Sequence, residues 1–465
     1  MLFHTWTFLF FFLIVFGGYL ALRPTRLWTS WLLLASYVFY GWWNPFYLLL
    51  IVYSTVLDFG VVAMMDRQQP GSSNRRHWLI VSIVNNLTLL AFFKYADFLI
   101  ENLNALGANF PEASRLMPFG LEYLLPVGIS FYTFQSLSYT LDFYRGTIKR
   151  ERSFVRFATF VTFFPQLVAG PIERSKNLLP QFRHAPRITT QHLTDGLSLF
   201  LVGLFKKLAL ANYLALYVDL VYSAPGDHNS IALLFATICF AWQIYFDFSG
   251  YTDMARGIAR MMGFNLMLNF NHPYLATGLG DFWSRWHISL STWFRDYLYL
   301  PLGGNRRGEL ITCRNLLIVF LASALWHGAA WHFIVWGALH AVGIILTRTL
   351  ERSTWYREHL PDTIKRLWVF AFVCFAWIFF RAETVGEAWL IVTRICTLDG
   401  AHPTTWPLPL GWLVLAAFAY QLSSLTAPTR RFITSSPVRI ATATCMLILL
   451  VFYSSSGGAF IYFQF

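Results

Sequence analysis

The chain has 465 residues, of which 56% are hydrophobic and only 12% are charged, a composition that excludes a soluble globular protein and indicates a polytopic membrane protein. The net charge of +12 does not indicate a nucleic-acid-binding protein, because Lys and Arg gather in the cytoplasmic loops of membrane proteins. The five cysteines form no CxxC pair and no zinc spacing, so the sequence predicts neither a disulfide framework nor a metal site.

Apolar stretches long enough to cross a bilayer, about 20 residues each, recur along the whole chain. The first has no basic segment before it and no small-residue cleavage site, which predicts a retained helix and not a signal peptide. The sequence predicts one membrane-embedded domain over residues 1–465, all-α and polytopic, with about 11–13 helices including re-entrant segments. The candidate spans are 5–22, 27–43, 45–65, 78–100, 122–143, 154–170, 193–222, 230–250, 311–328, 331–348, 366–381, 408–425 and 440–460.

Basic residues alternate between loops in a pattern that predicts the orientation of the helices. Loops 66–77 and 145–156 are rich in Arg and Lys, whereas 101–122 is neutral or acidic, so we expect the basic loops in the cytoplasm and an extracytoplasmic N-terminus. Segment 154–170 is followed by a further basic loop, so we expect it to enter the membrane and return on the same side. Residues 265–305 are too polar to span and too aromatic for a solvated loop, which predicts short amphipathic helices that line a cavity from the cytoplasmic side.

The segment YFDFSGYTDMARG, at 245–257, places two carboxylates, Asp247 and Asp253, at the end of an apolar run. One interpretation is a polar hinge that shapes a reaction chamber around Ser249 and Gly250. The other is an interfacial helix end, in which Ser249 or Asp253 acts as an N-cap. Taken alone, the residues favour the helix end.

The segment FWSRWHISLSTWFRDYLY, at 282–299, combines aromatic residues with charges and a histidine. Taken as one helix, it places Arg285 and His287 on different faces. Arg285 and Arg295 are candidates to form ion pairs or to hold a phosphate-bearing donor. The alternative is an amphipathic helix on the membrane surface, in which His287 is only a satisfied polar residue, and the spacing does not decide between the two.

The segment PLGGNRRGE, at 301–309, joins two glycines to Arg306 and Arg307. It lacks the GxxxxGK[ST] pattern of a phosphate-binding loop. A cytoplasmic turn is therefore the favoured interpretation.

The stretch from Asn315 to Leu346 is apolar enough to sit in a bilayer, yet it carries His327, His332 and His340. An ionisable residue at membrane depth is a functional hypothesis, because each buried polar group needs a partner or a role. His327 lies beside small residues that leave room for a substrate, and a neutral imidazole makes a good general base. His327 and His332 are five apart and do not stack on a helix, so we predict no metal site. The alternative is a core histidine that is hydrogen-bonded to a neighbouring helix.

Taken together and in order, these segments resemble the membrane-bound O-acyltransferase family, and within it the bacterial polysaccharide O-acetyltransferases of the alginate and cellulose type. The similarity covers residues 30–345, whereas the C-terminal helices, 366–460, add no motif. The segments that carry it are FFKYADF (92–98), LPVGISFYTFQSLSYTLDFYRG (125–146), FPQLVAGPIERSKNLLPQF (164–182), QIYFDFSGYTDMARG (243–257), NFNHPY (269–274), DFWSRWHISLSTWFRDYLYLPLGGNR (281–306) and LWHGAAWHFIVWGALH (325–340).

The resemblance implies a ring of helices around a central catalytic channel, with His327 as the catalytic histidine and His287 as a second histidine beside the channel. The implied activity moves acetyl groups from a cytoplasmic donor, acetyl-CoA, across the inner membrane to an exported polysaccharide such as alginate, cellulose or peptidoglycan. The implied partners are an extracytoplasmic acetyltransferase, a polysaccharide synthesis and secretion complex, and membrane lipid. No permanently bound cofactor and no nucleic acid are implied.

We hypothesise that His327 takes a proton from an acceptor hydroxyl, which then attacks the acetyl thioester. General-base catalysis of this kind contributes about 10²–10⁴-fold. His287 is expected to orient the donor or to polarise the thioester carbonyl. The candidates to bind the acidic part of the donor are Arg285, Arg295, Arg306 and Arg307.

Two non-enzymatic functions compete with acyl transfer: a transporter of acyl groups or polymer, and a membrane scaffold of a polysaccharide secretion complex. Intramembrane histidines and broken helices fit a transporter, but the sequence has no inverted repeat. A scaffold has no use for His327 in a niche of small residues. The sequence therefore favours an enzyme.

Overall fold

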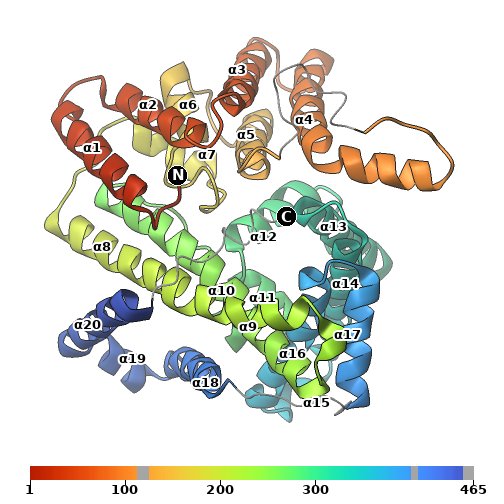
Figure 1. The fold of residues 1–465 in the computed structure, drawn as a ribbon. Helices are drawn as coiled ribbons and strands as arrows, with labels where there is room; N and C mark the ends of the chain where they lie inside the picture. The colour runs from red at the N-terminus through yellow and green to blue at the C-terminus, as the bar shows by residue number, and fades with distance from the viewer. Residues whose placement is uncertain (113–124, 399–406, 454–465) are drawn as a thin grey trace. The chain divides into compact units, whose positions relative to one another are not determined.

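The computed structural model describes residues 1–112, 125–398 and 407–453. Every regular element in these ranges is helical (Figure 1), which confirms the predicted all-α fold. The start of the predicted span 122–143 and the end of 440–460 lie outside the described residues.

Within the described ranges, seven helices are long and apolar enough to cross a membrane. This confirms the predicted multi-pass membrane protein. The seven are Tyr47–Asp66, Ser73–Ala105, Thr190–Tyr222, Ser230–Met261, Glu309–His327, Trp331–Leu350 and Asp362–Arg381.

The chain divides into two compact units, and the first comprises Met1–Phe200 with Met254–Met267. Its elements are α1 (Trp6–Leu22), α2 (Trp28–Gly41), α3 (Tyr47–Asp66), α4 (Ser73–Ala105), α5 (Ile129–Tyr144), α6 (Phe154–Thr162), α7 (Ser175–Leu178), the 3₁₀ turn η2 (Leu179–Phe182) and most of α8 (Thr190–Phe205).

The second unit comprises Leu201–Asp253 and Leu268–Phe465. Its elements are the π-helical η3 (Lys206–Ala211), α9 (Asn212–Tyr222), η4 (Pro225–Asp227), most of α10 (Ser230–Met261), η5 (Pro273–Leu275), α11 (Leu279–Arg285), α12 (Ile288–Phe294), the π-helical η6 (Arg295–Tyr299), α13 (Glu309–His327), α14 (Trp331–Leu350), α15 (Thr354–Glu358), α16 (Asp362–Arg381), α17 (Val385–Thr397), α18 (Leu408–Ser423), α19 (Ala427–Thr434) and α20 (Ser436–Tyr453).

A buried polar cluster joins α3, α4 and α5 in the first unit. Asp58 on α3 is fully buried and accepts hydrogen bonds from Ser82 Oγ at 2.6 Å, from Asn86 Nδ2 at 3.0 and 3.1 Å, and from Ser136 Oγ. Lipid offers no water to an unpaired polar group, so these bonds fix the three helices against one another. A carboxylate in an apolar span was a recognisable signal that the sequence analysis did not use.

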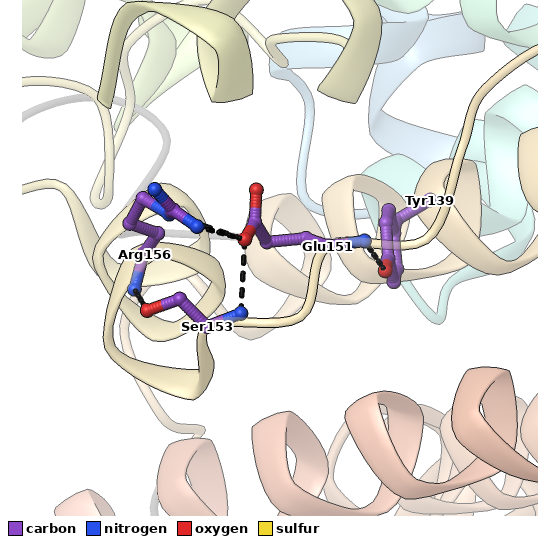
Figure 2. Close-up of polar contacts among 4 residues, drawn as sticks. All are labelled: Tyr139, Glu151, Ser153 and Arg156. Carbon is purple, nitrogen blue, oxygen red and sulfur yellow. Dashed lines mark hydrogen bonds and ion pairs between the residues drawn. The ribbon is translucent and has the colours of Figure 1, made fainter. Parts of the chain in front are cut away.

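Glu151 organises the basic loop that leads into α6, as Figure 2 shows. Its carboxylate accepts bonds from the Ser153 backbone N–H at 2.9 Å and from Arg156 Nη2 at 2.8 Å. Its own N–H donates to the Tyr139 hydroxyl at 3.0 Å, and Ser153 Oγ caps the new helix by accepting the Arg156 N–H. This loop therefore has a defined structure set by one buried carboxylate.

Helix α6 ends at Thr162, after nine residues. At 1.5 Å per residue it is about 14 Å long, less than half of the apolar core of a bilayer. The structure therefore agrees with the expectation that segment 154–170 does not cross the membrane as a helix, and the return to the same side stays a prediction.

Helix α10 runs without a break from Ser230 to Met261, so the interpretation of Asp247 and Asp253 as markers of an interfacial helix end is wrong. Both carboxylates lie inside the helix and pair with lysines of η3: Asp247 with Lys207 Nζ at 2.6 Å, and Asp253 with Lys206 Nζ at 2.7 Å. The hinge interpretation stays a prediction: α10 shows no break at Ser249 and Gly250, and the irregular segment beside it is the π-helical η3.

Helices α13 and α14 pack along each other in the second unit (Figure 1). Gly337 of α14 permits this approach, since a Cβ there would lie 2.7 Å from both Phe320 O and Ala324 Cβ. The pair carries the histidine-bearing stretch identified in the sequence.

Candidate active site

His327 is the last residue of α13, and its side chain is buried. The chain turns at once through Gly328, where a Cβ would lie 2.1 Å from the Phe333 ring. A side chain at this position would therefore displace the Phe333 ring, which the glycine allows to pack against the turn. The small residues that suggested room for a substrate have this structural role as well.

Aromatic rings surround the His327 imidazole. The ring centroids of Trp326, Trp336 and Phe380 lie 5.0, 5.1 and 5.3 Å from that of His327, with interplanar angles of 85°, 84° and 77°. These edge-to-face contacts hold the imidazole in one orientation and exclude water from it. A neutral imidazole held in this way can take a proton from a hydroxyl that reaches it.

His287 lies at a break between two short helices, and the treatment of 282–299 as one helix is wrong. Helix α11 ends at Arg285 and α12 begins at Ile288, and His287 between them adopts the left-handed conformation, with φ 43° and ψ 53°. Such a conformation is rare for a residue with a side chain and marks a position that its surroundings hold in place. The expectation of short helices within 265–305 is confirmed.

The His287 ring is fully buried, and this burial lowers its pKa to about 3. It packs edge-to-face on Phe248 of α10, with centroids 4.7 Å apart, and lies 5.9 Å from the Trp326 indole. The imidazole is therefore neutral at physiological pH.

Trp326 brings the two predicted histidines together, because its indole contacts both His327 and His287. The two histidines are 40 positions apart in the sequence. Their common contact with one indole defines the candidate active site of the second unit.

The four predicted donor-binding arginines are placed differently. Arg285 pairs with Asp281 at 2.7 Å, one helical turn away, and Arg295 pairs with its neighbour Asp296 at 2.9 Å. Arg306 and Arg307 are exposed in the turn that follows η6, as expected for a turn. Donor binding by these residues stays a prediction.

The other two histidines of the stretch hold the packing around the site. His332 Nδ1 lies 2.9 Å from Phe379 O of α16, and His340 Nδ1 accepts the Trp283 indole N–H at 3.3 Å. Both imidazoles are therefore bonded to groups of neighbouring elements, whereas the choice between base and core histidine for His327 stays open to test.

Lys206 and Lys207 were missed by the sequence analysis. Both lie in an apolar span and are paired with the two aspartates of α10, and Lys207 is almost fully buried. Two adjacent lysines at membrane depth were the signal that could have found them. Asp247, which pairs with Lys207, directly precedes Phe248, and the Phe248 ring packs on His287.

Comparison with known proteins decides the family to which this arrangement belongs. The sequence model of the membrane-bound O-acyltransferase family matches residues 144–385, which include both candidate histidines. The chain belongs to the membrane-bound O-acyltransferase family. It is an O-acyltransferase, and the expected resemblance is confirmed.

Three relatives show how far the similarity to this membrane-bound O-acyltransferase extends. The chain is 42% identical to the "probable alginate O-acetylase" of Azotobacter vinelandii, over 84% of this chain and 77% of that protein. It is 42% identical to the protein of the same name from Pseudomonas aeruginosa, over 90% and 81%. It is 38% identical to the "peptidoglycan O-acetyltransferase" of Helicobacter pylori, over 86% and 80%.

Proposed function

We propose that this O-acyltransferase moves acetyl groups from cytoplasmic acetyl-CoA, across the bacterial inner membrane, to hydroxyl groups on the far side. The acetyl groups serve the O-acetylation of an exported polysaccharide of the alginate, cellulose or peptidoglycan class. The observation that carries the proposal is the placement of His327, at the end of a membrane-spanning helix and beside the indole that also contacts His287. The names of the relatives support acetyl as the acyl group and a polysaccharide as the final acceptor.

His327 acts as the general base in the proposed reaction. It removes the proton of the acceptor hydroxyl while the hydroxyl oxygen attacks the acetyl carbonyl, so that a C–O bond forms and the C–S bond of the thioester breaks. The proton then passes from the imidazole to the leaving sulfur, which departs as a thiol. The aromatic rings around His327 exclude water, which would otherwise hydrolyse the thioester.

The partners in this proposal act on either side of the membrane. An extracytoplasmic acetyltransferase takes the acetyl group from the exit side and completes its transfer within the polysaccharide secretion complex. Arg285, Arg295, Arg306 and Arg307 bind the acidic part of acetyl-CoA on the cytoplasmic side, and the exposure of Arg306 and Arg307 supports this role.

The proposal is tested in cells that produce the polysaccharide, by measuring its acetyl content after replacement of the chromosomal gene. His327→Gln is expected to reduce the acetyl content at least 100-fold, because glutamine cannot act as a base. The control is His332→Gln, which removes another buried histidine of the same stretch and keeps a donor for Phe379 O. Normal acetylation with His327→Gln would exclude His327 as the base. Equal loss in both variants at matched expression would indicate a packing role.

A further inference from the structure

Asn269 lies beside His287 and is fully buried. Its backbone carbonyl accepts the Ile288 N–H at 2.9 Å, directly after the left-handed residue. Its side-chain oxygen, Oδ1, lies 3.2 Å from His287 Nδ1. The same oxygen accepts the backbone N–H of Ser289 at 3.1 Å and the Ser289 hydroxyl at 2.9 Å.

These contacts determine which atom of the amide faces His287. A backbone N–H can only donate, so the Asn269 atom that faces the Ser289 N–H must be the oxygen and not the NH₂ group. An amide oxygen can only accept hydrogen bonds. Ser289 Oγ also lies 3.4 Å from His287 Nδ1, but its proton is donated to Asn269 Oδ1. Nδ1 therefore faces two acceptors and carries the proton, and in a neutral imidazole the lone pair is then on Nε2.

We propose that Asn269 is a positioning residue that fixes His287 in the Nδ1–H tautomer, so that His287 acts in acyl transfer as a hydrogen-bond acceptor through Nε2. This inference deepens the proposed function and rests on it. It replaces the expectation that His287 polarises the thioester carbonyl, because that role needs a donor and Nε2 of this tautomer has no proton. The group that Nε2 binds is an O–H or N–H donor: the acceptor hydroxyl, or an amide of the acetyl-CoA arm.

The side chains around the His287 ring are compatible with a neutral imidazole that carries its proton on Nδ1. Among the described residues, Asn269, Ser289, Phe248, Phe270 and Trp326 contact the His287 ring, and these five side chains do not ionise. Two titratable groups are next in the chain to these neighbours. Asp247 precedes Phe248 and is paired with Lys207, and His327 follows Trp326. Burial keeps the imidazole neutral, so the tautomer set by Asn269 decides its hydrogen bonding.

The first test is spectroscopic and independent of activity. The full-length protein is labelled with ¹⁵N-histidine in lipid, and the His287 signals are assigned by their loss in His287→Gln. The proposal expects a protonated Nδ1 and an unprotonated Nε2. A proton on Nε2 would overturn it, whatever the acetylation assays show.

The second test uses Asn269→Asp, which keeps an acceptor oxygen and adds a negative charge beside Nδ1. That charge favours the imidazolium and raises the pKa of His287, and the imidazolium cannot accept a hydrogen bond. The acid limb of the pH–rate profile is therefore expected to move to higher pH, with near-normal kcat at alkaline pH. An unchanged profile in a folded variant, together with an unchanged His287 signal, would overturn the positioning role.

The kinetic constants of His287→Gln identify the group that donates a hydrogen bond to Nε2 of His287. A rise in KM for acetyl-CoA with kcat unchanged identifies the amide of the donor arm, whereas a fall in kcat with KM unchanged identifies the acceptor hydroxyl. Unchanged kcat and KM would overturn the role of His287 in acyl transfer. That result would leave the proposed function standing, because His327→Gln tests it separately.

Discussion

At the residue scale, Gly328 allows close packing of the Phe333 ring, which occupies the place of a Cβ. We expect Gly328→Ala to displace Phe333, which contacts Phe380 and through it the wall of His327. Overpacking of this kind costs about 1–3 kcal/mol of stability. Acyl transfer should fall at least tenfold, measured with labelled acetyl-CoA in membranes. The control is Gly411→Ala on α18, where a Cβ meets open space, and loss of activity there would refute the argument.

His287 makes stability depend on pH. Burial lowers its pKa to about 3, whereas the unfolded chain has the ordinary value of about 6.5. Between these values the unfolded state binds more protons, so the stabilisation is complete above pH 6.5 and is lost as the pH falls. The decrease in Tm from pH 7.5 to pH 5 in detergent should therefore be smaller in His287→Gln than in the wild type. An identical decrease would show that His287 is not buried in the neutral form.

At the element scale, η3 is joined to α10 by two ion pairs, of which Lys207–Asp247 is the more deeply buried. Breaking a buried pair by removing one partner costs about 3–5 kcal/mol, because the other charge stays buried without compensation. Asp247→Asn should therefore lower the Tm markedly. Asp296→Asn, which breaks the more exposed pair with Arg295, is the control and should cost about 0–1 kcal/mol. Equal effects in thermal unfolding would contradict this assignment.

The sequence predicts where long helices lie better than it predicts where a helix breaks or which helices pair. The seven long apolar helices were predictable because an apolar run of about 20 residues is needed to cross a bilayer, whereas the other six predicted spans match shorter helices. The break at His287 was not, because its left-handed backbone is held by Asn269, 18 positions away. The pairing of Lys206 with Asp253, 47 positions apart, was also beyond local patterns. Helix α17 was missed because its 13 residues are too few for a span.

At the scale of the whole molecule, the histidine stretch was identifiable from sequence because polar groups at membrane depth are rare. The common contact of His327 and His287 with Trp326 required the packing of α13 against the α11–α12 break. The sequence likewise could not show that Arg285 and Arg295 pair with carboxylates of their own helical elements.

The proposed reaction moves no net charge across the membrane. The acetyl group passes outward in exchange for the proton of the acceptor hydroxyl, which ends on the cytoplasmic thiol. Moving one charge through 100 mV changes the energy by about 2.3 kcal/mol, or roughly 50-fold in rate. We therefore expect the rate of acetyl transfer in vesicles to be unchanged when valinomycin and potassium set the potential from 0 to −100 mV. A strong dependence would favour a charge-coupled transporter.

The most direct test of the central claim follows acetyl groups through inside-out membrane vesicles that contain the protein, its extracytoplasmic partner and the polysaccharide. Acetyl-labelled acetyl-CoA is supplied outside, at the cytoplasmic face, and label is measured on luminal polysaccharide for wild type, His327→Gln and His332→Gln at matched expression. We expect luminal label with wild type and His332→Gln and none above background with His327→Gln. Equal label in all three would contradict acyl transfer at His327.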